Sequence, residues 1–243
     1  MAKQLSDGKR ELDFLDQVAR TTDRRTFLHW SGLTLAVVAL GCSDDEDDGG
    51  TGPGTTDVNL GSGDTGILNY AYALEQLEAA FYTQVVGSFY AGATADEQTI
   101  LTDIRNHEVI HRDFLKAALG ASAIADLQVD FSSINFADRA SVLGAARTFE
   151  DLGVSAYNGA GQLLTDAANL LVAGKIVSVE ARHAAAIRDL LVPGSSAVGS
   201  FAGDDTVDPT TGLEIPERAP AAVLAAADTY VTTTINASGL PTS

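Results

Sequence analysis

The sequence predicts an all-α protein built around an antiparallel four-helix bundle. Four long stretches carry apolar residues three and four positions apart, the spacing that places them on one face of an α-helix. No stretch of comparable length alternates apolar and polar residues as a half-buried strand would. The links between the first and second stretches and between the third and fourth are short, so each pair is expected to form a helix hairpin. The longer link from Gly120 to Ala137 can cross from one hairpin to the other.

The bundle is expected over residues 65–191. Its four helices are predicted at residues 65–89, 94–120, 137–164 and 166–191. Thr94, with Glu97 three residues later, has the pattern of a capping box, and Gly120 is a typical residue to end the helix that begins there. Pro193 stands just beyond the fourth helix, where a proline commonly follows a helix end.

Residues 192–243 are expected to form a loop-rich extension with one short helix. A stretch rich in Gly, Asp and Pro runs from 194 to 216. An apolar segment at 219–235 follows it, and we expect this segment to form a fifth helix on the outside of the bundle.

Residues 1–41 have the organisation of a bacterial export signal. Residues 24–28 (RRTFL) resemble the paired arginines of a twin-arginine signal, and the apolar run at 32–40 is too short to span a bilayer. Residues 40–42 (LGC) resemble a lipobox, in which Cys42 would be lipidated and become the mature N-terminus. The alternative is an amphipathic helix that buries Cys42. We expect a twin-arginine route and a lipid anchor in the cell envelope, on the periplasmic side or at the cell surface.

Residues 42–64 are expected to be a flexible acidic tether. Residues 43–54 (SDDEDDGGTGPG) contain no apolar side chain that could support a fold of their own. Directly after a lipidated cysteine, such a run also resembles the acidic surface-export signal of some bacterial lipoproteins.

Charge and cysteine content exclude several classes of function. The chain has 33 acidic and 15 basic residues and a net charge of −18, so a nucleic-acid backbone would be repelled. The single cysteine excludes an internal disulfide and a thiolate metal cluster.

Carboxylates lie on the apolar stripe of all four predicted helices, at Glu75, Glu108, Glu150 and Glu180. An unpaired buried carboxylate lowers the stability of the fold by several kcal/mol, unless its pKa rises until the group is neutral. Four of them would cancel the stability of a domain, which is only about 5–15 kcal/mol. The few basic residues of these helices lie mostly off the stripes, so the pattern indicates bound cations.

The same residues form an internal repeat. Each of the two predicted hairpins contains a glutamate followed seven residues later by a tyrosine. Each also contains a glutamate followed three residues later by a histidine. These pairs are Glu75–Tyr82 and Glu150–Tyr157, and Glu108–His111 and Glu180–His183. Residues three apart on a helix share a face and can bind one ion. Four carboxylates and two neutral imidazoles carry a charge of −4, which two divalent cations would neutralise.

This pattern resembles the ferritin-like di-metal carboxylate superfamily, which includes ferritins, bacterioferritins, rubrerythrins and manganese catalases. Their sites use a Glu from each of two helices and a Glu-x-x-His from each of the other two. The run at 74–82 (LEQLEAAFY) is similar to exported bacterial ferritin-like domain proteins akin to desiccation-related proteins. The resemblance implies six metal ligands: Glu75, Glu108, His111, Glu150, Glu180 and His183.

The resemblance also implies roles around these ligands. Glu108 and Glu180 would bridge the two metal ions, and Tyr82 and Tyr157 would donate hydrogen bonds that orient carboxylates. The alternative for both tyrosines is an ordinary place in the core.

Glu78 is the alternative to Glu75 on the first helix. In the internal repeat Glu75 aligns with Glu150, whereas Glu78 aligns with Gly153. We therefore favour Glu75 as the ligand and expect Glu78 to be an acid just outside the ligand set or a surface acid.

A zinc metalloprotease is a minor alternative, because residues 107–111 spell H-E-x-x-H. One protease class would continue with Gly and His, where this chain has Phe114 and Ala117. No Glu lies between 108 and 150 to serve as third ligand, and the second Glu-x-x-His would be unexplained. In the di-metal interpretation His107 is a bystander.

A carboxylate-held pair of Fe ions, or alternatively Mn ions, can exchange two electrons with O2, peroxide or Fe2+. The sequence thus predicts a ferroxidase- or catalase-like oxidoreductase whose contact with the membrane is the lipid anchor alone. The alternative is a lipoprotein that holds metal without turnover, or is purely structural, and protects the envelope during stress or desiccation. A homo-oligomer is compatible with either.

Overall fold

The computed structural model describes residues 57–242, apart from 194–198 and 216. The predicted signal peptide, Cys42 and the tether up to residue 56 lie outside the described residues. The folded unit discussed below falls within Pro53–Ser243. In the part of the chain that the structure describes, no helix is both long enough and apolar enough to cross a membrane.

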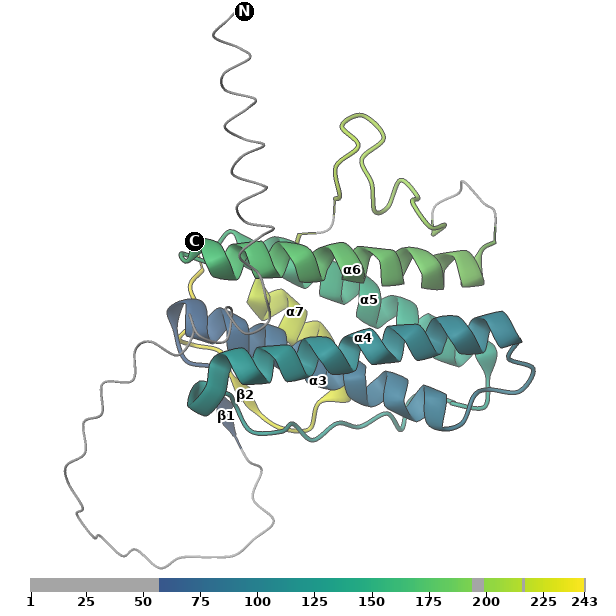
Figure 1. Cartoon of the computed structure of the whole chain (residues 1–243), viewed down its shortest axis with the longest axis horizontal. Helices are drawn as coiled ribbons and strands as arrows, with labels where there is room; N and C mark the ends of the chain where they lie inside the picture. Colours follow the sequence, from purple (N-terminus) through teal and green to yellow (C-terminus); the bar gives the residue numbers. More distant parts are fainter. Residues whose placement is uncertain (1–56, 194–198, 216, 243) are drawn as a thin grey trace, which may run out of the picture. The chain divides into compact units, whose positions relative to one another are not determined.

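The four-helix bundle is confirmed. Its helices are α3 (Gly63–Gly87), α4 (Ala95–Leu119), α5 (Arg139–Gly161) and α6 (Ala167–Leu191). They lie alongside one another, with α3 packed on α4 and α5 packed on α6, as expected for two hairpins (Figure 1). The link between α4 and α5 begins with a short 3₁₀ turn, Gly120–Ser122, and then runs along the bundle to the start of α5.

The helix ends follow from local side-chain chemistry. At the start of α4, Thr94 Oγ1 accepts from the Glu97 amide at 3.2 Å, and the Thr94 amide donates to Glu97 Oε2 at 2.7 Å. This is the predicted capping box. Asp138 and Asp166 cap α5 and α6 in the same way, each accepting a hydrogen bond from a first-turn amide. Gly120 follows α4 with a φ of 55°, a conformation that favours glycine.

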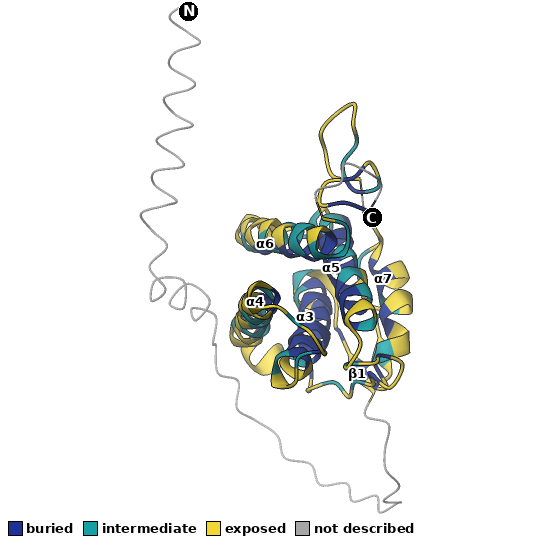
Figure 2. Cartoon of the chain, turned by 90° about the vertical axis from the view of Figure 1, so that its right-hand side faces the viewer, coloured by how far each residue is buried: buried dark blue, intermediate teal, exposed yellow. Residues whose placement is uncertain are grey.

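The bundle has an inner and an outer pair of helices. Of the 25 residues of α3, 16 are buried, whereas α6 of the same length buries six. Figure 2 shows α3 largely buried, while α4 and α6 each present an exposed face. The inner helices α3 and α5 therefore supply most of the core, and α4 and α6 close it on one side.

The predicted fifth helix at 219–235 is only partly correct. Helix α7 covers Pro220–Ala227 and is followed by a 3₁₀ turn, Asp228–Tyr230. Beyond it the chain is extended, because its backbone pairs with other segments: the Thr232 amide donates to the Gln128 carbonyl at 2.8 Å. Strand β2 (Ile235–Asn236) then pairs in parallel with β1 (Val58–Asn59).

Strand β1 also corrects the expected length of the tether. Val58 and Leu60 are buried in the core, and α3 begins at Gly63. Residues 57–64, assigned to the tether from sequence, therefore belong to the folded unit. Val58 and Leu60 have the two-residue spacing of a strand, but two apolar positions are too few to distinguish a strand from a linker.

The C-terminal extension is fastened to α5 and α6 by buried polar contacts. Arg188 of α6 is 3% exposed and donates to Asp151 of α5 and to Asp205 of the extension. Further along, the Arg218 amide donates to the Ser155 carbonyl at 3.1 Å. The extension is thus part of the packed structure and covers the outer side of α5.

A glycine in α5 provides a test of this packing. A Cβ added to Gly159 would lie 1.9 Å from the Arg218 carbonyl oxygen, whereas one added to Gly144 in the same helix would meet nothing within 4 Å. We expect Gly159→Ala to lower the free energy of unfolding by about 1–3 kcal/mol. Gly144→Ala should raise it by up to about 1 kcal/mol through helix propensity. Chemical denaturation of both variants measures this, and equal effects would contradict the packing of residue 218 on α5.

Candidate metal centre

The six predicted ligands meet in the middle of the bundle, although they come from four helices. Each helix contributes from the face it turns inward. The contributions are Glu75 from α3, Glu108 and His111 from α4, Glu150 from α5, and Glu180 and His183 from α6. All four carboxylates are fully buried, and the two imidazole side chains are 12% and 5% exposed.

The six side chains form two overlapping groups, each of three carboxylates and one imidazole. The first group is Glu75, Glu108, His111 and Glu180, and the second is Glu108, Glu150, Glu180 and His183. Within each group, one possible ligand atom per residue lies within 4.8 Å of all the others. Glu108 and Glu180 belong to both groups, which is the arrangement expected of bridging carboxylates.

His111 faces the carboxylates of the first group through one nitrogen. Its Nδ1 lies 2.9 Å from Glu180 Oε1, 3.4 Å from Glu75 Oε2 and 3.6 Å from Glu108 Oε2. The nearest of these carboxylates belongs to the opposite hairpin. The imidazole therefore ties α4 to α6 across the side of the bundle where those two helices face each other.

His183 repeats this geometry from α6. Its Nδ1 lies 2.8 Å from Glu108 Oε1, 3.5 Å from Glu150 Oε2 and 3.8 Å from Glu180 Oε2. The two Glu-x-x-His motifs are thus related by an approximate two-fold arrangement, in which each histidine approaches the shared glutamate of the other helix.

The two tyrosines hold the unshared glutamates by crossed hydrogen bonds. Tyr82 of α3 donates to Glu150 Oε1 at 2.5 Å, and Tyr157 of α5 donates to Glu75 Oε1 at 2.6 Å. Each bond occupies one carboxylate oxygen and leaves Oε2 directed at the histidine of its group. The tyrosines therefore contact the ligand set directly, as the orienting role predicts.

Buried polar atoms without a hydrogen-bond partner gather at this centre. Eight such atoms belong to the six residues: both oxygens of Glu108 and Glu180, Oε2 of Glu75 and Glu150, and Nδ1 of His111 and His183. The short histidine–glutamate distances do not have hydrogen-bond alignment, so these atoms face one another around common points. Buried polar groups are normally satisfied. Each of the two groups contains four of these eight atoms, and four such ligand atoms could hold a metal ion.

The charges of this cluster shift several pKa values. Burial lowers the pKa of His111 and His183, but three neighbouring carboxylates in each case outweigh it and raise the pKa to about 12. Burial and then Glu180 raise the pKa of Glu108 well above its ordinary value, and burial raises that of Glu150 to about 7. Burial opposes ionisation of Glu180 as well, yet its contacts with both imidazoles hold its pKa below the usual value.

Two protonated imidazoles therefore supply positive charge to the metal-free centre. The charge of −4 expected from the sequence treats both histidines as neutral and so leaves out this positive charge. Since an imidazole must lose its Nδ1 proton before that nitrogen can bind a metal, cations and protons compete for the same positions.

His107 is not the bystander that the sequence suggested. Its Nδ1 lies 2.9 Å from His183 Nε2, and the two ring planes are within 8° of each other with centroids 5.1 Å apart. With both nitrogens between the centroids, the rings meet edge to edge in nearly one plane. If His183 Nδ1 binds a metal, its proton lies on Nε2 and is donated to His107.

This contact also weakens the zinc-protease interpretation. His107 belongs to neither ligand group found among the described residues, so the two histidines of the H-E-x-x-H motif do not converge on one ion. His111 faces the bundle interior, whereas His107 is exposed and lies beside His183 of α6.

Glu78 lies beside the ligand cluster but in neither ligand group, so it is not the surface acid that was one of the two expectations. It is 4% exposed, and burial together with Glu180 raises the pKa of its carboxyl well above the ordinary value. A Cβ at Gly153 would lie 3.1 Å from Glu78 Oε1 and 3.6 Å from Glu180 Oε2. Gly153 therefore makes room for Glu78 beside the centre. The internal repeat gives no sign of this, because the alignment of Glu78 with Gly153 does not show that the two residues face each other across helices.

The fold and the buried cluster together define a class: four-helix bundles of the ferritin-like type, with Glu and Glu-x-x-His positions facing the interior. A family model, the Ferritin-like domain, matches residues 63–193, and the chain belongs to this family. The match covers all six predicted ligands and confirms the resemblance drawn from the sequence. A search of curated proteins finds no match to the chain.

The contact between His107 and His183 can be tested by substitution. Removing such an outer partner typically costs about 10- to 100-fold in metal affinity, and we expect that loss in His107→Ala. His107→Asn places an amide oxygen near the position of Nδ1 and should restore most of the affinity. Competition between a chelator and the protein for Mn2+ or Co2+ measures both variants. Equal affinity in native protein and both variants would show that His107 does not orient His183.

Proposed function

We propose that the protein is an exported, lipid-anchored ferritin-like protein that binds two Fe ions, or alternatively two Mn ions, and performs redox chemistry with O2, peroxide or Fe2+. The observation that carries this proposal is the set of eight unsatisfied buried atoms, four in each overlapping group. Protonated His111 and His183 offset only part of the charge of four buried carboxylates, so such a set favours bound cations. Carboxylate oxygens with one imidazole per position suit Fe and Mn.

Charge balance supports two divalent ions. The four carboxylates carry −4 when ionised, and neutral imidazoles add nothing. Glu78 would add a fifth negative charge, but burial raises the pKa of its carboxyl well above the ordinary value and favours its neutral form. Two divalent cations therefore neutralise the buried cluster.

When bound, a pair of Fe or Mn ions supplies two electrons to O2 or peroxide, or takes electrons from Fe2+. The residues of this chain would bind the ions and orient the carboxylates that hold them. Glu108 and Glu180 belong to both ligand groups and would contribute to both metal positions. Tyr82 and Tyr157 hold the unshared carboxylates in place, and the buried surroundings exclude bulk water.

A second candidate function is metal binding without turnover. The four carboxylates have no solvent exposure, which suits an ion that is held permanently as well as one that reacts. In that case the protein would be a structural lipoprotein that protects the envelope during stress or desiccation. Turnover assays with peroxide and with O2 on metal-loaded protein separate the two candidates.

The export route and the anchor belong to the same proposal. Residues 1–41 have the order of a twin-arginine signal followed by a lipobox, and Cys42 would carry the lipid. A twin-arginine route transports folded proteins, which would allow the centre to be loaded before export. The anchor would hold the mature protein at the periplasmic side or the cell surface.

Metal content is the first test. We expect about two Fe or Mn per chain by elemental mass spectrometry of the purified protein. The Glu108→Ala/Glu180→Ala double variant should lose both, because each glutamate belongs to both groups. Asp103→Asn, which removes an exposed acid from α4, should retain them. A folded native protein without metal would contradict the proposal, and one Zn that survives replacement of Glu180 and His183 would support the protease alternative.

Metal binding should also depend on pH. With a pKa of about 12, both imidazoles are protonated at neutral pH in the metal-free protein. Metal uptake must therefore release at least two protons per chain: two from the histidines, and more from Glu108 and Glu150, whose pKa values are also raised. Affinity should rise as pH rises. Calorimetric titration in buffers of different ionisation enthalpy counts the protons. An affinity that is independent of pH would show that the imidazoles are not ligands.

A further inference from the structure

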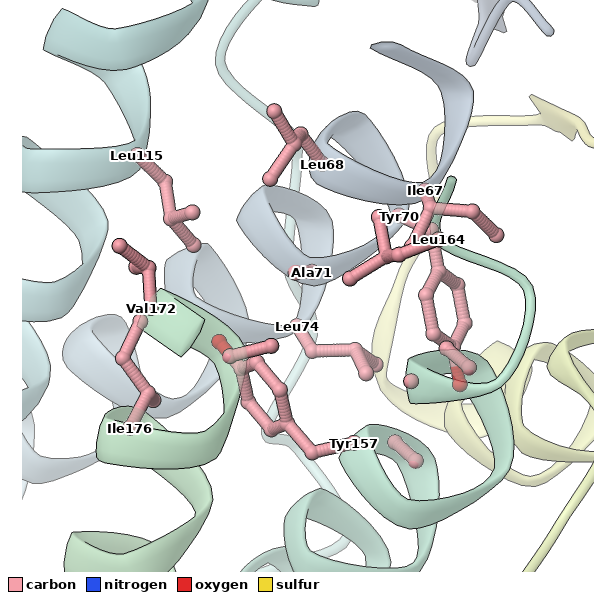
Figure 3. A pocket seen from close by; sticks show the side chains of 14 residues that line it. Ile67, Leu68, Tyr70, Ala71, Leu74, Leu115, Tyr157, Leu164, Val172 and Ile176 are labelled. Atoms are coloured by element: carbon pink, nitrogen blue, oxygen red, sulfur yellow. The ribbon is translucent and has the colours of Figure 1, made fainter. Parts of the chain in front are cut away.

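A small apolar cavity lies between the four helices on one side of the metal centre. It has a volume of about 20 Å³ and is lined by residues of all four helices. Figure 3 shows Leu74, Leu115, Tyr157 and Ile176 among the side chains around it. The wall is almost wholly apolar, since the two tyrosines that contribute to it do so through their rings.

The cavity is adjacent to the first ligand group. Three of its lining residues stand one helical turn, four positions, from members of that group. These pairs are Ala71 with Glu75, Leu115 with His111, and Ile176 with Glu180. Tyr157 connects the two directly, because its ring lines the cavity and its hydroxyl donates to Glu75 at 2.6 Å.

The cavity also extends toward the surface. Its inner wall is buried, with Leu115 1% exposed. Its outer wall is formed by half-buried side chains, including Leu68, Leu164 and Val172 near the connection between α5 and α6. A small molecule that entered between these side chains would reach the first group without meeting a charged residue among those lining the cavity.

Size and polarity limit what the cavity can take. A volume of about 20 Å³ leaves room for a molecule the size of dioxygen, whereas organic substrates are too large. Cavities with apolar walls stay dry and bind apolar atoms or molecules such as xenon. Peroxide or a hydrated Fe2+ ion would lose hydrogen bonds that this wall cannot replace.

We propose that this cavity is the binding and entry site for dioxygen at the first ligand group. The inference rests on the proposed function and names O2 as the reactant that arrives by this route. Peroxide and hydrated ions reach the centre elsewhere, from the side of α4 and α6, where His111 is partly exposed.

Xenon tests the cavity without relying on activity. Xenon pressurised into crystals of the protein as purified should occupy the space between Leu74, Leu115 and Ile176. Ala173→Leu, a change at a half-buried lining position of α6, should abolish that occupancy. Ala185→Leu is the matched control, because Ala185 is also half-buried on α6 but lines a different pocket. Absence of xenon from the native cavity, or binding of toluene there, would overturn the proposal.

A kinetic comparison tests the route. With Fe2+ loaded under anaerobic conditions, Ala173→Leu should slow oxidation by O2 several-fold and leave oxidation by peroxide unchanged, while Ala185→Leu should change neither. Equal slowing with both oxidants would overturn the proposal. A protein that holds no metal would contradict the proposed function alone, because xenon occupancy reports on the cavity whether or not metal is bound.

Discussion

Four carboxylates buried side by side require positive charge, and much of the structure is arranged around that requirement. Protonated His111 and His183 can supply part of it, since their neighbours raise both pKa values to about 12. Their Nδ1 atoms, however, are also the atoms that would bind the cations. In the metal-free protein, protons on the imidazoles thus offset part of the buried negative charge, and a bound cation would have to displace them.

The crossed tyrosines show how the bundle keeps this geometry. Tyr82 and Tyr157 come from the inner helices α3 and α5, and each holds the glutamate of the other helix. The histidines instead come from the outer helices α4 and α6. The inner pair therefore positions the unshared ligands, whereas the shared carboxylates and the imidazoles lie on the two helices that close the core on one side.

The elements that could be predicted from sequence were those with a repeated signal. Helical spacing gave all four long helices to within a few residues, and the spacing of Glu and His gave six side chains that the structure brings together. Contacts between helices leave no such signal. The bond from His107 to His183 and the space that Gly153 leaves for Glu78 depend on which side chains face each other across helices. The predicted end of the fifth helix was wrong, because backbone pairing with distant segments outweighs the local apolar pattern after residue 230.

The two ligand groups are alike in composition but lie in different surroundings. The first group borders the apolar cavity through Tyr157 and Ile176, whereas the second leads through His183 to the exposed His107. Apolar molecules and protons would therefore reach the centre from different directions. A hairpin repeat that builds two equivalent positions needs only a few unmatched residues to make them chemically distinct. Glu78 opposite Gly153 and the imidazole of His107 are such residues, and neither alters the ligand set itself.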